Sequence, residues 1–286
     1  MNISNNWTDY ECIATGDGEK LERWGNVILN RPDPQIIWNK TNNPVWNTWD
    51  GYYERSKTGG GSWHFKHKLK DYWTIKYKDL TFKVSPTNFK HTGIFPEQAT
   101  NWDYIIDKIK ESNQKEFRVL NLFAYTGCAT MAASSAGASE VVHVDSSKGM
   151  IDWAKENMKL SGLENNRIRF IQDDVLKFLE KEKRRGRTYR AIIMDPPSYG
   201  RGPNKEVWKL EDNLQELLNK TKDILDKDFS FLLINCYTTG FSPTSLYNIL
   251  SLTFKKNKLL TGEIGLPVTE NNLVLPCGIY GKVSKY

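Results

Sequence analysis

The chain predicts an α/β fold in which a small β-rich N-terminal region precedes an open, mostly parallel sheet with helices on both faces. Two observations support this prediction. From residue 97 onward, short β-branched runs alternate with stretches of helical period, which is the pattern that builds a parallel sheet. Residues 1–84 show short strand and turn patterns with little helical period. We therefore expect a β-rich region over 1–92 and a Rossmann-like domain over 93–286.

The N-terminal region combines turn residues with aromatic and basic ones. Residues 1–60 are rich in Trp, Asn, Pro and Gly, and residues 62–84 alternate aromatic with basic side chains. The second stretch predicts a hairpin of strands 72–78 and 80–84. Single-stranded RNA binds basic grooves with aromatic platforms, which makes Lys66, Lys68 and Trp73 candidate RNA contacts. The same alternation also fits a strand pair with its aromatic residues inward and its lysines outward.

The larger domain is predicted from a repeated strand–helix alternation. We expect strands over 118–123, 140–144, 167–171, 191–194 and 230–235, and helices over 99–110, 130–136, 148–161, 175–184 and 211–226. The tail offers two strands, 258–268 and 272–283, separated by a turn. It predicts an antiparallel hairpin at one edge of the sheet.

Ligand-type residues follow three successive predicted strands. Ligands of an open parallel sheet bind beyond the carboxyl ends of its strands. The first strand runs into Ala-Tyr-Thr-Gly-Cys, where Gly127 lets the backbone approach a ligand closely. The second ends in Asp145, which can accept from ribose hydroxyls, and the third in Asp173 and Asp174, which can accept from an adenine amine. Each acid alone could instead cap the helix that follows it. A single glycine argues against a dinucleotide site.

The fourth strand leads into Asp195-Pro196-Pro197-Ser-Tyr199. Proline fixes φ and removes an N–H donor, so this loop is rigid. We expect Asp195 to grip a planar base or amine and Tyr199 to stack on it. The alternative is a plain Pro-Pro turn leaving a buried strand.

These motifs together resemble a known family. The runs VLNLFAYTGCAT, VDSS, QDDVLKFL and DPPSYGRGPNKEVWKLED, with HTGIFPEQATNW upstream, resemble class I methyltransferases related to the 23S ribosomal RNA cytosine-carbon-5 enzymes. The resemblance runs from about residue 80 to the end of the chain. It implies S-adenosylmethionine as cofactor and RNA, ribosomal RNA above all, as substrate. The PUA-type RNA-binding module of many relatives is not recognisable in residues 1–60. The implied cofactor-pocket residues are Phe95, Gln98, Phe123, Ala124, Tyr125, Gly127, Asp145, Ser146, Asp173, Asp174 and Asp195.

Cys236 occupies the place of the cysteine nucleophile in relatives of the cytosine type, just after the fifth strand. A thiolate adding to carbon 6 would activate carbon 5 of cytosine. Asn235 and Tyr237 flank it, whereas the relatives carry a small residue after the cysteine. The alternative is a buried, inert thiol. In that case methyl transfer to an exocyclic amine of RNA, protein or a small molecule needs only orientation. A non-catalytic RNA-binding protein is the remaining alternative.

The net charge and the spacing of histidines and cysteines limit the ligands that the protein can bind. The net charge of +6 permits a polyanionic partner. We expect no metal site, because neither the four histidines nor the four cysteines have metal-ligand spacing.

The basic cluster at 181–187 is expected to be a solvated helix end. No signal peptide or membrane-spanning run is recognisable, so we expect a cytoplasmic protein, either monomer or homodimer.

Overall fold

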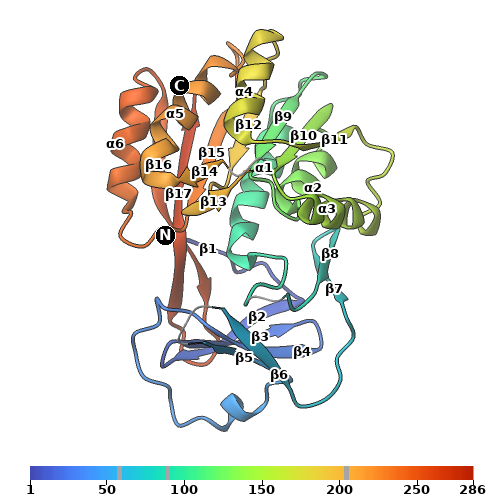
Figure 1. Cartoon of the computed structure of the whole chain (residues 1–286), viewed down its shortest axis with the longest axis vertical. Helices are drawn as coiled ribbons and strands as arrows, with labels where there is room; N and C mark the ends of the chain where they lie inside the picture. The colour runs from blue at the N-terminus through green and yellow to red at the C-terminus, as the bar shows by residue number, and fades with distance from the viewer. Residues whose placement is uncertain (57–59, 88–89, 203–205, 286) are drawn as a thin grey trace. The chain divides into compact units, whose positions relative to one another are not determined.

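The computed structural model describes residues 1–56, 60–87, 90–202 and 206–285 (Figure 1). The chain divides into two compact units. The first comprises Met1–Thr100 with Ile264–Cys277, and the second comprises Asn101–Glu263 with Gly278–Tyr286.

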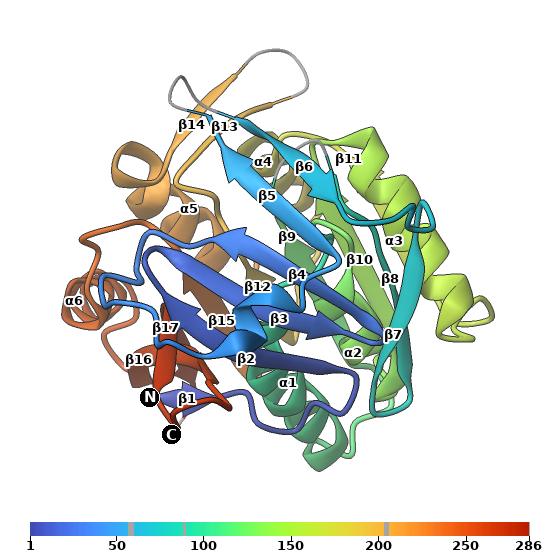
Figure 2. The same ribbon diagram turned by 90° about the horizontal axis from the view of Figure 1, so that it is seen from below.

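The first unit is built on a five-stranded sheet with the order β2-β3-β4-β5-β6, whose strands lie side by side in Figure 2. Strands β4 and β5 pair in parallel and the other neighbours are antiparallel. The strands are β2 (Tyr10–Gly16), β3 (Glu19–Trp24), β4 (Val27–Pro32), β5 (Gly51–Arg55) and β6 (Gly61–Phe65). A separate hairpin joins β7 (Trp73–Tyr77) and β8 (Leu80–Val84), and it confirms the hairpin predicted there. The remaining elements are β1 (Asn2–Ile3), η1 (Pro44–Asn47) and η2 (Pro96–Gln98).

A buried ion pair lies in the interior of the first unit. Arg31 on β4 donates to both carboxylate oxygens of Glu22 on β3, over 2.6 and 2.8 Å. The Tyr10 hydroxyl donates to the same carboxylate over 2.7 Å. The pair is bidentate and fully hydrogen-bonded, as a buried charge must be to avoid a large desolvation cost. Cross-strand neighbours thus supply a polar core that a strand pattern alone does not reveal.

The second unit contains the predicted open sheet, in the order β16-β17-β15-β12-β9-β10-β11. Strands β15, β12, β9, β10 and β11 pair in parallel, and β17 pairs antiparallel with β15. The α/β fold class with its antiparallel edge hairpin is therefore confirmed. The strands are β9 (Arg118–Leu122), β10 (Glu140–Asp145), β11 (Ile168–Gln172), β12 (Ala191–Met194), β15 (Phe231–Cys236), β16 (Lys258–Pro267) and β17 (Val274–Ser284). The helices are α1 (Ala99–Glu111), α2 (Cys128–Ser135), α3 (Lys148–Leu160), α4 (Val175–Arg184), α5 (Leu210–Asp223) and α6 (Pro243–Thr253).

Successive side chains of the central strands point to opposite faces of the sheet. Leu120 and Leu122 join the apolar cluster that contains the buried residues of α4, α5 and α6. Asn121, between them, donates over 2.9 Å to Thr130 on α2, and the Phe231 ring of β15 meets the Tyr104 ring of α1 at 5.3 Å. The helices therefore cover both faces, as Figure 1 shows for this unit. This double burial explains why the strands are near-continuous apolar runs.

A hairpin and a helix of the second unit lie outside the sequence prediction. A small antiparallel hairpin joins β13 (Tyr199–Arg201) and β14 (Val207–Lys209), directly after the Pro-Pro turn. Helix α6 precedes the edge strands, and Ser242 caps its first turn by accepting from the backbone N–H of Ser245. Strands of three residues are too short to show a period of two, so the hairpin had no readable signal.

Lys282 on β17 gives a stability prediction. Only 9% of its surface is exposed, its Nζ lies 3.9 Å from the Tyr104 ring centroid, and burial together with the charge of Lys108 lowers its pKa to about 8. The charged side chain therefore costs stability below pH 8, and this cost disappears as pH rises toward the ordinary lysine pKa. Lys282→Met should raise the free energy of unfolding by about 1–3 kcal/mol at pH 7, and by much less near pH 10.5.

Urea unfolding at the two pH values measures this difference. Lys285→Met is the control, since Lys285 is exposed and should change stability by no more than about 0.5 kcal/mol. An equal effect of Lys282→Met at both pH values would show that the gain comes from packing rather than from removing a charge.

Candidate active site

The carboxyl ends of β12, β9, β10 and β11 lie along one edge of the sheet in the second unit. Strand order reverses between β9 and β12, because β10 and β11 extend to one side and β15 to the other. At this point the backbone N–H of Asp195 donates to the Leu122 carbonyl over 3.3 Å. A crevice at such a reversal is where ligands of open α/β sheets bind. The predicted loops after β9 and β12 are therefore neighbours.

The loop after β9 has an unusual backbone. Phe123, Tyr125 and Gly127 all have positive φ values, of 53°, 51° and 81°. For the two aromatic residues the left-handed region costs about 1–3 kcal/mol each, and it persists only where the surroundings hold it. Part of that support is the Tyr125 N–H, which donates to Asp145 Oδ2 over 2.8 Å. Backbone strain of this kind concentrates at ligand-binding sites.

Gly127 begins α2 above a closely packed interior. A Cβ at this position would lie 3.0 Å from the Ala154 Cβ and 3.3 Å from His143 Cε1. His143 is buried, its Nδ1 lies 3.0 Å from the Thr130 hydroxyl, and burial lowers its pKa to about 3, so the ring is neutral at physiological pH. A neutral, buried His143 supports the loop from below. The sequence carries no signal for this role, because the contact joins residues far apart in the chain.

Asp145 ties the first two loops together. Its Oδ1 accepts from the Ser147 N–H over 2.8 Å, while its Oδ2 accepts from Tyr125 of the neighbouring loop. Ser147, and not Asp145, is the N-cap of α3, so the capping alternative for Asp145 is wrong. Burial raises the pKa of the Asp145 carboxyl, although backbone N–H groups, among them that of Ser146, counteract the shift. A half-buried carboxylate at the end of the second strand fits the ribose of a nucleoside cofactor.

The acids after β11 have local partners. Asp174 is the N-cap of α4, and its Oδ1 accepts from the Lys177 N–H over 3.0 Å, which confirms the capping alternative for this residue. Asp173 accepts from the Asp174 N–H and forms a 2.6 Å ion pair with Lys181. Both side chains are half-buried at the same edge as Asp145. Capping leaves the second oxygen of Asp174 without a hydrogen-bond partner among the described residues, so an adenine contact stays a prediction.

The Asp-Pro-Pro loop is fixed from the side by the unpredicted hairpin. The indole N–H of Trp208 on β14 donates to the Pro197 carbonyl over 2.6 Å, and its ring lies 4.9 Å from that of Phe123. Trp208 therefore contacts both the loop after β9 and the loop after β12. The Ser198 hydroxyl also lies 2.7 Å from the Thr238 hydroxyl. Pro197 itself is exposed and Asp195 is half-buried, so the loop is held while its outer surface remains accessible.

Tyr199 and Cys236 differ sharply in exposure. The Tyr199 side chain is 54% exposed, as a residue that stacks on a substrate must be. Cys236 is 1% exposed and lies within the apolar cluster of the sheet. Burial, with a smaller effect from the Asp195 charge, raises the pKa of the Cys236 thiol well above its usual range. The thiol is therefore protonated near neutral pH.

The residues beside Cys236 are engaged in packing. Asn235 is buried and its side-chain oxygen accepts from the Asn101 amide over 2.9 Å. The Tyr237 ring lies against Gly278, where an added Cβ would approach it to 2.9 Å. A glycine on the neighbouring strand thus makes room for the bulky residue that sets this sequence apart from cytosine-type relatives.

Five predicted site residues belong to the first unit. Phe95 is half-buried and precedes η2, and Gln98 is 7% exposed at the end of that turn. The exposed Lys66 places its Nζ 4.4 Å from the Trp49 ring centroid, and Lys68 is also exposed. The indole N–H of Trp73 donates to the Trp24 carbonyl over 2.9 Å, a structural role that its sequence position did not reveal. Their roles toward cofactor and RNA remain predictions.

Among the residues that the structure describes, no three His, Cys, Asp or Glu side chains are grouped so as to hold a metal ion. In the same part of the chain, no helix is both long enough and apolar enough to cross a membrane.

Comparisons with known proteins agree with this geometry. A family model for S-adenosylmethionine-dependent methyltransferases matches residues 41–241. The crystal structure of a SAM-dependent methyltransferase from Agrobacterium tumefaciens superimposes with a TM-score of 0.95 at 34% identity, covering 100% of this chain and 93% of that one. Ribosomal RNA large subunit methyltransferase K/L of Shewanella frigidimarina is 33% identical over 54% of this chain and 21% of its own length. Ribosomal RNA large subunit methyltransferase I of Enterobacter sp. is 34% identical over 52% and 33%.

The chain thus spans only one fifth to one third of the length of these two ribosomal RNA methyltransferases. The family model, by contrast, covers most of the chain, and it includes every loop at the carboxyl edge of the sheet from Phe123 to Tyr199. This chain belongs to the S-adenosylmethionine-dependent methyltransferase family.

Proposed function

We propose that this enzyme transfers the methyl group of S-adenosylmethionine to an exocyclic amine of a base in ribosomal RNA. The observation that carries the proposal is the meeting of the Asp195-Pro196-Pro197 loop with the strained loop after β9 at the reversal of strand order. The strained loop after β9 suits the cofactor, and the Asp195-Pro196-Pro197 loop suits a planar acceptor. The names of the two ribosomal RNA methyltransferases support RNA as the substrate.

The residues present fit the cofactor. Gly127 and the start of α2 allow close approach of its amino-acid part, and Asp145 suits its ribose. Asp174, or its neighbour Asp173, suits the adenine amine. When bound, the cofactor supplies an electrophilic methyl group. The family resemblance makes Phe95 and Gln98 further candidate contacts of the cofactor.

Asp195 orients the acceptor. Its carboxylate can accept hydrogen bonds from an amine N–H, which turns the nitrogen lone pair toward the methyl carbon. The bound cofactor would supply the methyl group to this nitrogen, and the Asp195 carboxylate can take up the proton that the amine gives up. Tyr199, exposed beside the loop, is suited to stack on the base.

The burial of Cys236 favours the amine over carbon 5 of cytosine. Addition to carbon 6 requires a thiolate that reaches the base, whereas this thiol is buried among apolar side chains and its pKa is raised. Transfer to cytosine carbon 5 is the second candidate, and it rests on Cys236 standing at the end of β15, the place of the nucleophile in the cytosine-type enzymes that the sequence resembles. It requires a rearrangement that brings the sulfur out of the core.

Cys236→Ala separates the two candidates. We expect the variant to retain activity within about threefold, because an amine acceptor needs no nucleophile from the protein. The assay uses labelled S-adenosylmethionine and RNA from a strain lacking the gene, with nucleoside mass spectrometry to identify the product. Cys277→Ala, another buried cysteine, is the control for packing effects.

A cytosine mechanism would give the opposite pattern. Cys236→Ala would lose activity while Cys277→Ala would keep it. The natural enzyme would also form a covalent complex with RNA containing 5-fluorocytosine. If the natural enzyme binds S-adenosylmethionine but methylates no RNA, then RNA is not its substrate.

A further inference from the structure

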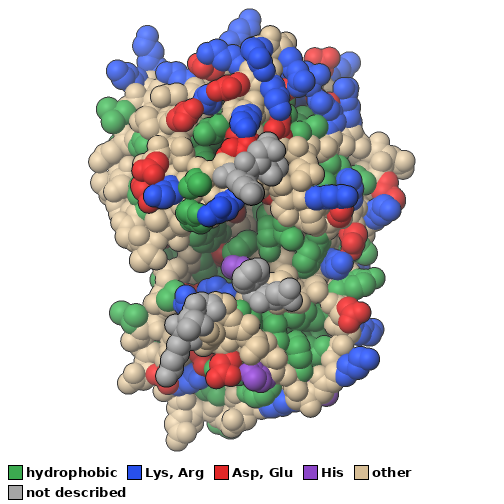
Figure 3. Space-filling view, in the orientation of Figure 1, with side chains coloured by type: hydrophobic (Ala, Val, Ile, Leu, Met, Phe, Trp, Pro, Cys, Tyr) green, Lys and Arg blue, Asp and Glu red, His purple; other side chains and the backbone are tan. Residues whose placement is uncertain are grey.

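Basic residues gather at the edge of the second unit opposite the methyl-transfer loops. Segments 183–190 and 254–258 hold eight basic residues and no acidic one, whereas the whole chain has a net charge of only +6. Segment 183–190 leads into β12, and segment 254–258 leads into β16. Both therefore lie at the amino ends of strands in one sheet. Lys and Arg side chains crowd this end of the unit in Figure 3.

Hydrogen bonds and an ion pair join these segments into one surface. Arg190 donates to the Asp228 carbonyl over 2.7 Å, and Lys285 pairs with the Asp228 carboxylate at 2.9 Å. The Asn257 amide donates to the Ser284 carbonyl over 3.4 Å. We call the surface formed by 183–190, 227–228, 254–258, 285 and Lys115 the basic edge. Its strands run in the order β16-β17-β15-β12-β9, which makes the row about 20 Å long at the usual strand spacing.

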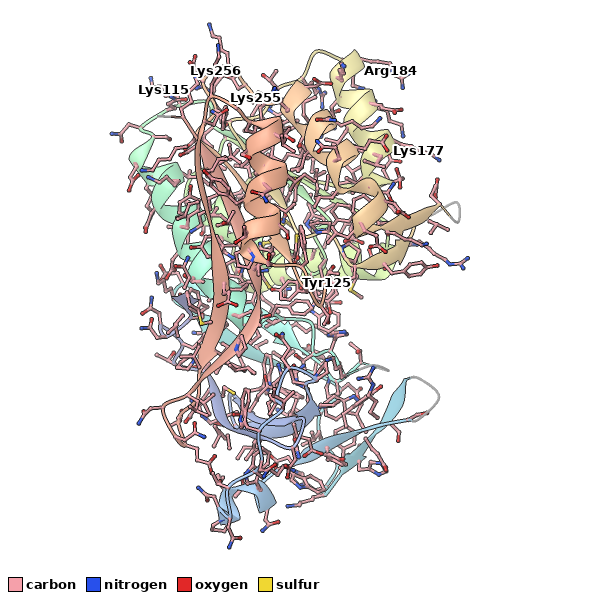
Figure 4. All side chains as sticks on the ribbon, turned by 90° about the vertical axis from the view of Figure 1, so that its left-hand side faces the viewer. Lys115, Tyr125, Lys177, Arg184, Lys255 and Lys256 are labelled. Atoms are coloured by element: carbon pink, nitrogen blue, oxygen red, sulfur yellow. The ribbon has the colours of Figure 1, made fainter. Side chains whose placement is uncertain are left out.

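The acid of the basic edge, Asp228, is paired with Lys285. Two acids beside the edge are also paired: Asp223 binds Lys183 at 2.8 Å, and Asp226 lies 3.7 Å from Arg190. Six exposed cations of the basic edge form no ion pair with any described carboxylate: Lys115, Arg184, Lys227, Lys255, Lys256 and Lys258. Figure 4 labels four of them, Lys115, Arg184, Lys255 and Lys256, at the end of the unit away from Tyr125. Unneutralised cations in a row suit a polyanion with regularly spaced charges.

The aromatic residues that the structure describes on or directly beside the basic edge are buried. Tyr189, Phe229 and Phe254 are at most 9% exposed, so none can stack on a splayed base. Single-stranded RNA is bound by cations together with exposed aromatic platforms, whereas helical RNA is recognised through its phosphates and shape. The basic edge offers cations without exposed aromatic rings, and it therefore has the chemistry to bind helical RNA.

We propose that the basic edge binds the phosphate backbone of a double-helical RNA segment while another part of the same RNA enters the methyl-transfer site. This inference rests on the proposed function and adds a second contact to it. The strands separate the two edges by about 15–20 Å, which a nucleotide or short peptide cannot span. The natural substrate is therefore a folded RNA, and the solvated helix end expected at 181–187 forms part of a binding surface.

The test combines charge reversal with charge retention at the same three positions. The triple variant Arg184→Glu, Lys255→Glu, Lys256→Glu is compared with Arg184→Lys, Lys255→Arg, Lys256→Arg. Binding of an RNA duplex of about 20 base pairs is measured by fluorescence anisotropy over a range of KCl concentrations. Charge reversal should weaken binding at least about tenfold and reduce the slope of log affinity against log salt by about 2–3, while charge retention should leave both unchanged.

Two controls keep the result specific to the basic edge. S-adenosylmethionine affinity should be the same in all proteins, since the cofactor loops lie at the other edge. Lys155→Glu, on α3 beside Asp152 at 3.6 Å, should not affect duplex binding. Unchanged duplex affinity and salt slope after charge reversal would overturn the proposal. So would a selective loss of affinity for a single-stranded oligonucleotide. Methylation of RNA by the natural enzyme is assayed separately, so failure of the proposed function is distinguishable from failure of this inference.

Discussion

Replacing Asp195 with Ala should lower kcat by about 10²–10⁴-fold while changing S-adenosylmethionine affinity much less. The carboxylate is the group suited to accept the hydrogens of the acceptor amine, and a positioned acid or base typically contributes that much to the rate. The side chain is half-buried at the end of β12, so its removal leaves no large cavity. Methyl incorporation into RNA and isothermal titration with the cofactor measure the two quantities.

Asp195→Asn is the matched control. It keeps the shape and one carbonyl oxygen, and it should retain more activity than Asp195→Ala because that oxygen can still accept from one N–H. Activity of Asp195→Ala within about threefold of the natural enzyme would mean that the acceptor does not bind at this loop. Parallel losses of activity and of cofactor affinity would instead assign Asp195 to the cofactor pocket.

Gly127→Ala should both destabilise the protein and weaken cofactor binding. The residue has a φ of 81°, and an added Cβ would lie 3.0 Å from the Ala154 Cβ and 3.3 Å from a Met131 methyl carbon. We expect the free energy of unfolding to fall by about 2–4 kcal/mol, from backbone strain together with overpacking. We also expect at least a tenfold loss of S-adenosylmethionine affinity, because the loop must move to relieve the contact.

Gly137→Ala is the control that separates the effect of backbone strain from the effect of close packing at Gly127. Gly137 follows the other end of α2 with a φ of 96°, and an added Cβ would meet nothing within 4 Å. This variant should lose only about 1 kcal/mol and bind the cofactor normally. Urea unfolding and the rise in Tm on adding cofactor measure both effects. Equal losses in the two variants would show that Gly127 is needed for its φ value and not for close packing under the cofactor.

Local pattern was sufficient to predict most of the second unit. Strand β12 and helix α4 have the predicted bounds, and the other predicted elements agree within three residues at either end. The central strands are buried on both faces and most of the helices are amphipathic, so these elements carry a signal within a short window. The hairpin β13–β14 escaped prediction because its strands have three residues each.

The sequence by itself determined the family, the order of the sheet-forming elements and the acids that end its strands. These depend on periodicity and on short motifs, which are properties of neighbouring residues. The tertiary structure alone decided which residues support the site. His143 beneath Gly127 and Trp208 beside Pro197 act through contacts between segments distant in the chain. It also decided the ionisation of Cys236, since a thiol becomes hard to deprotonate only when other segments bury it. The basic edge likewise depends on the tertiary structure, because it forms only where separate loops meet at the amino ends of the strands of one sheet.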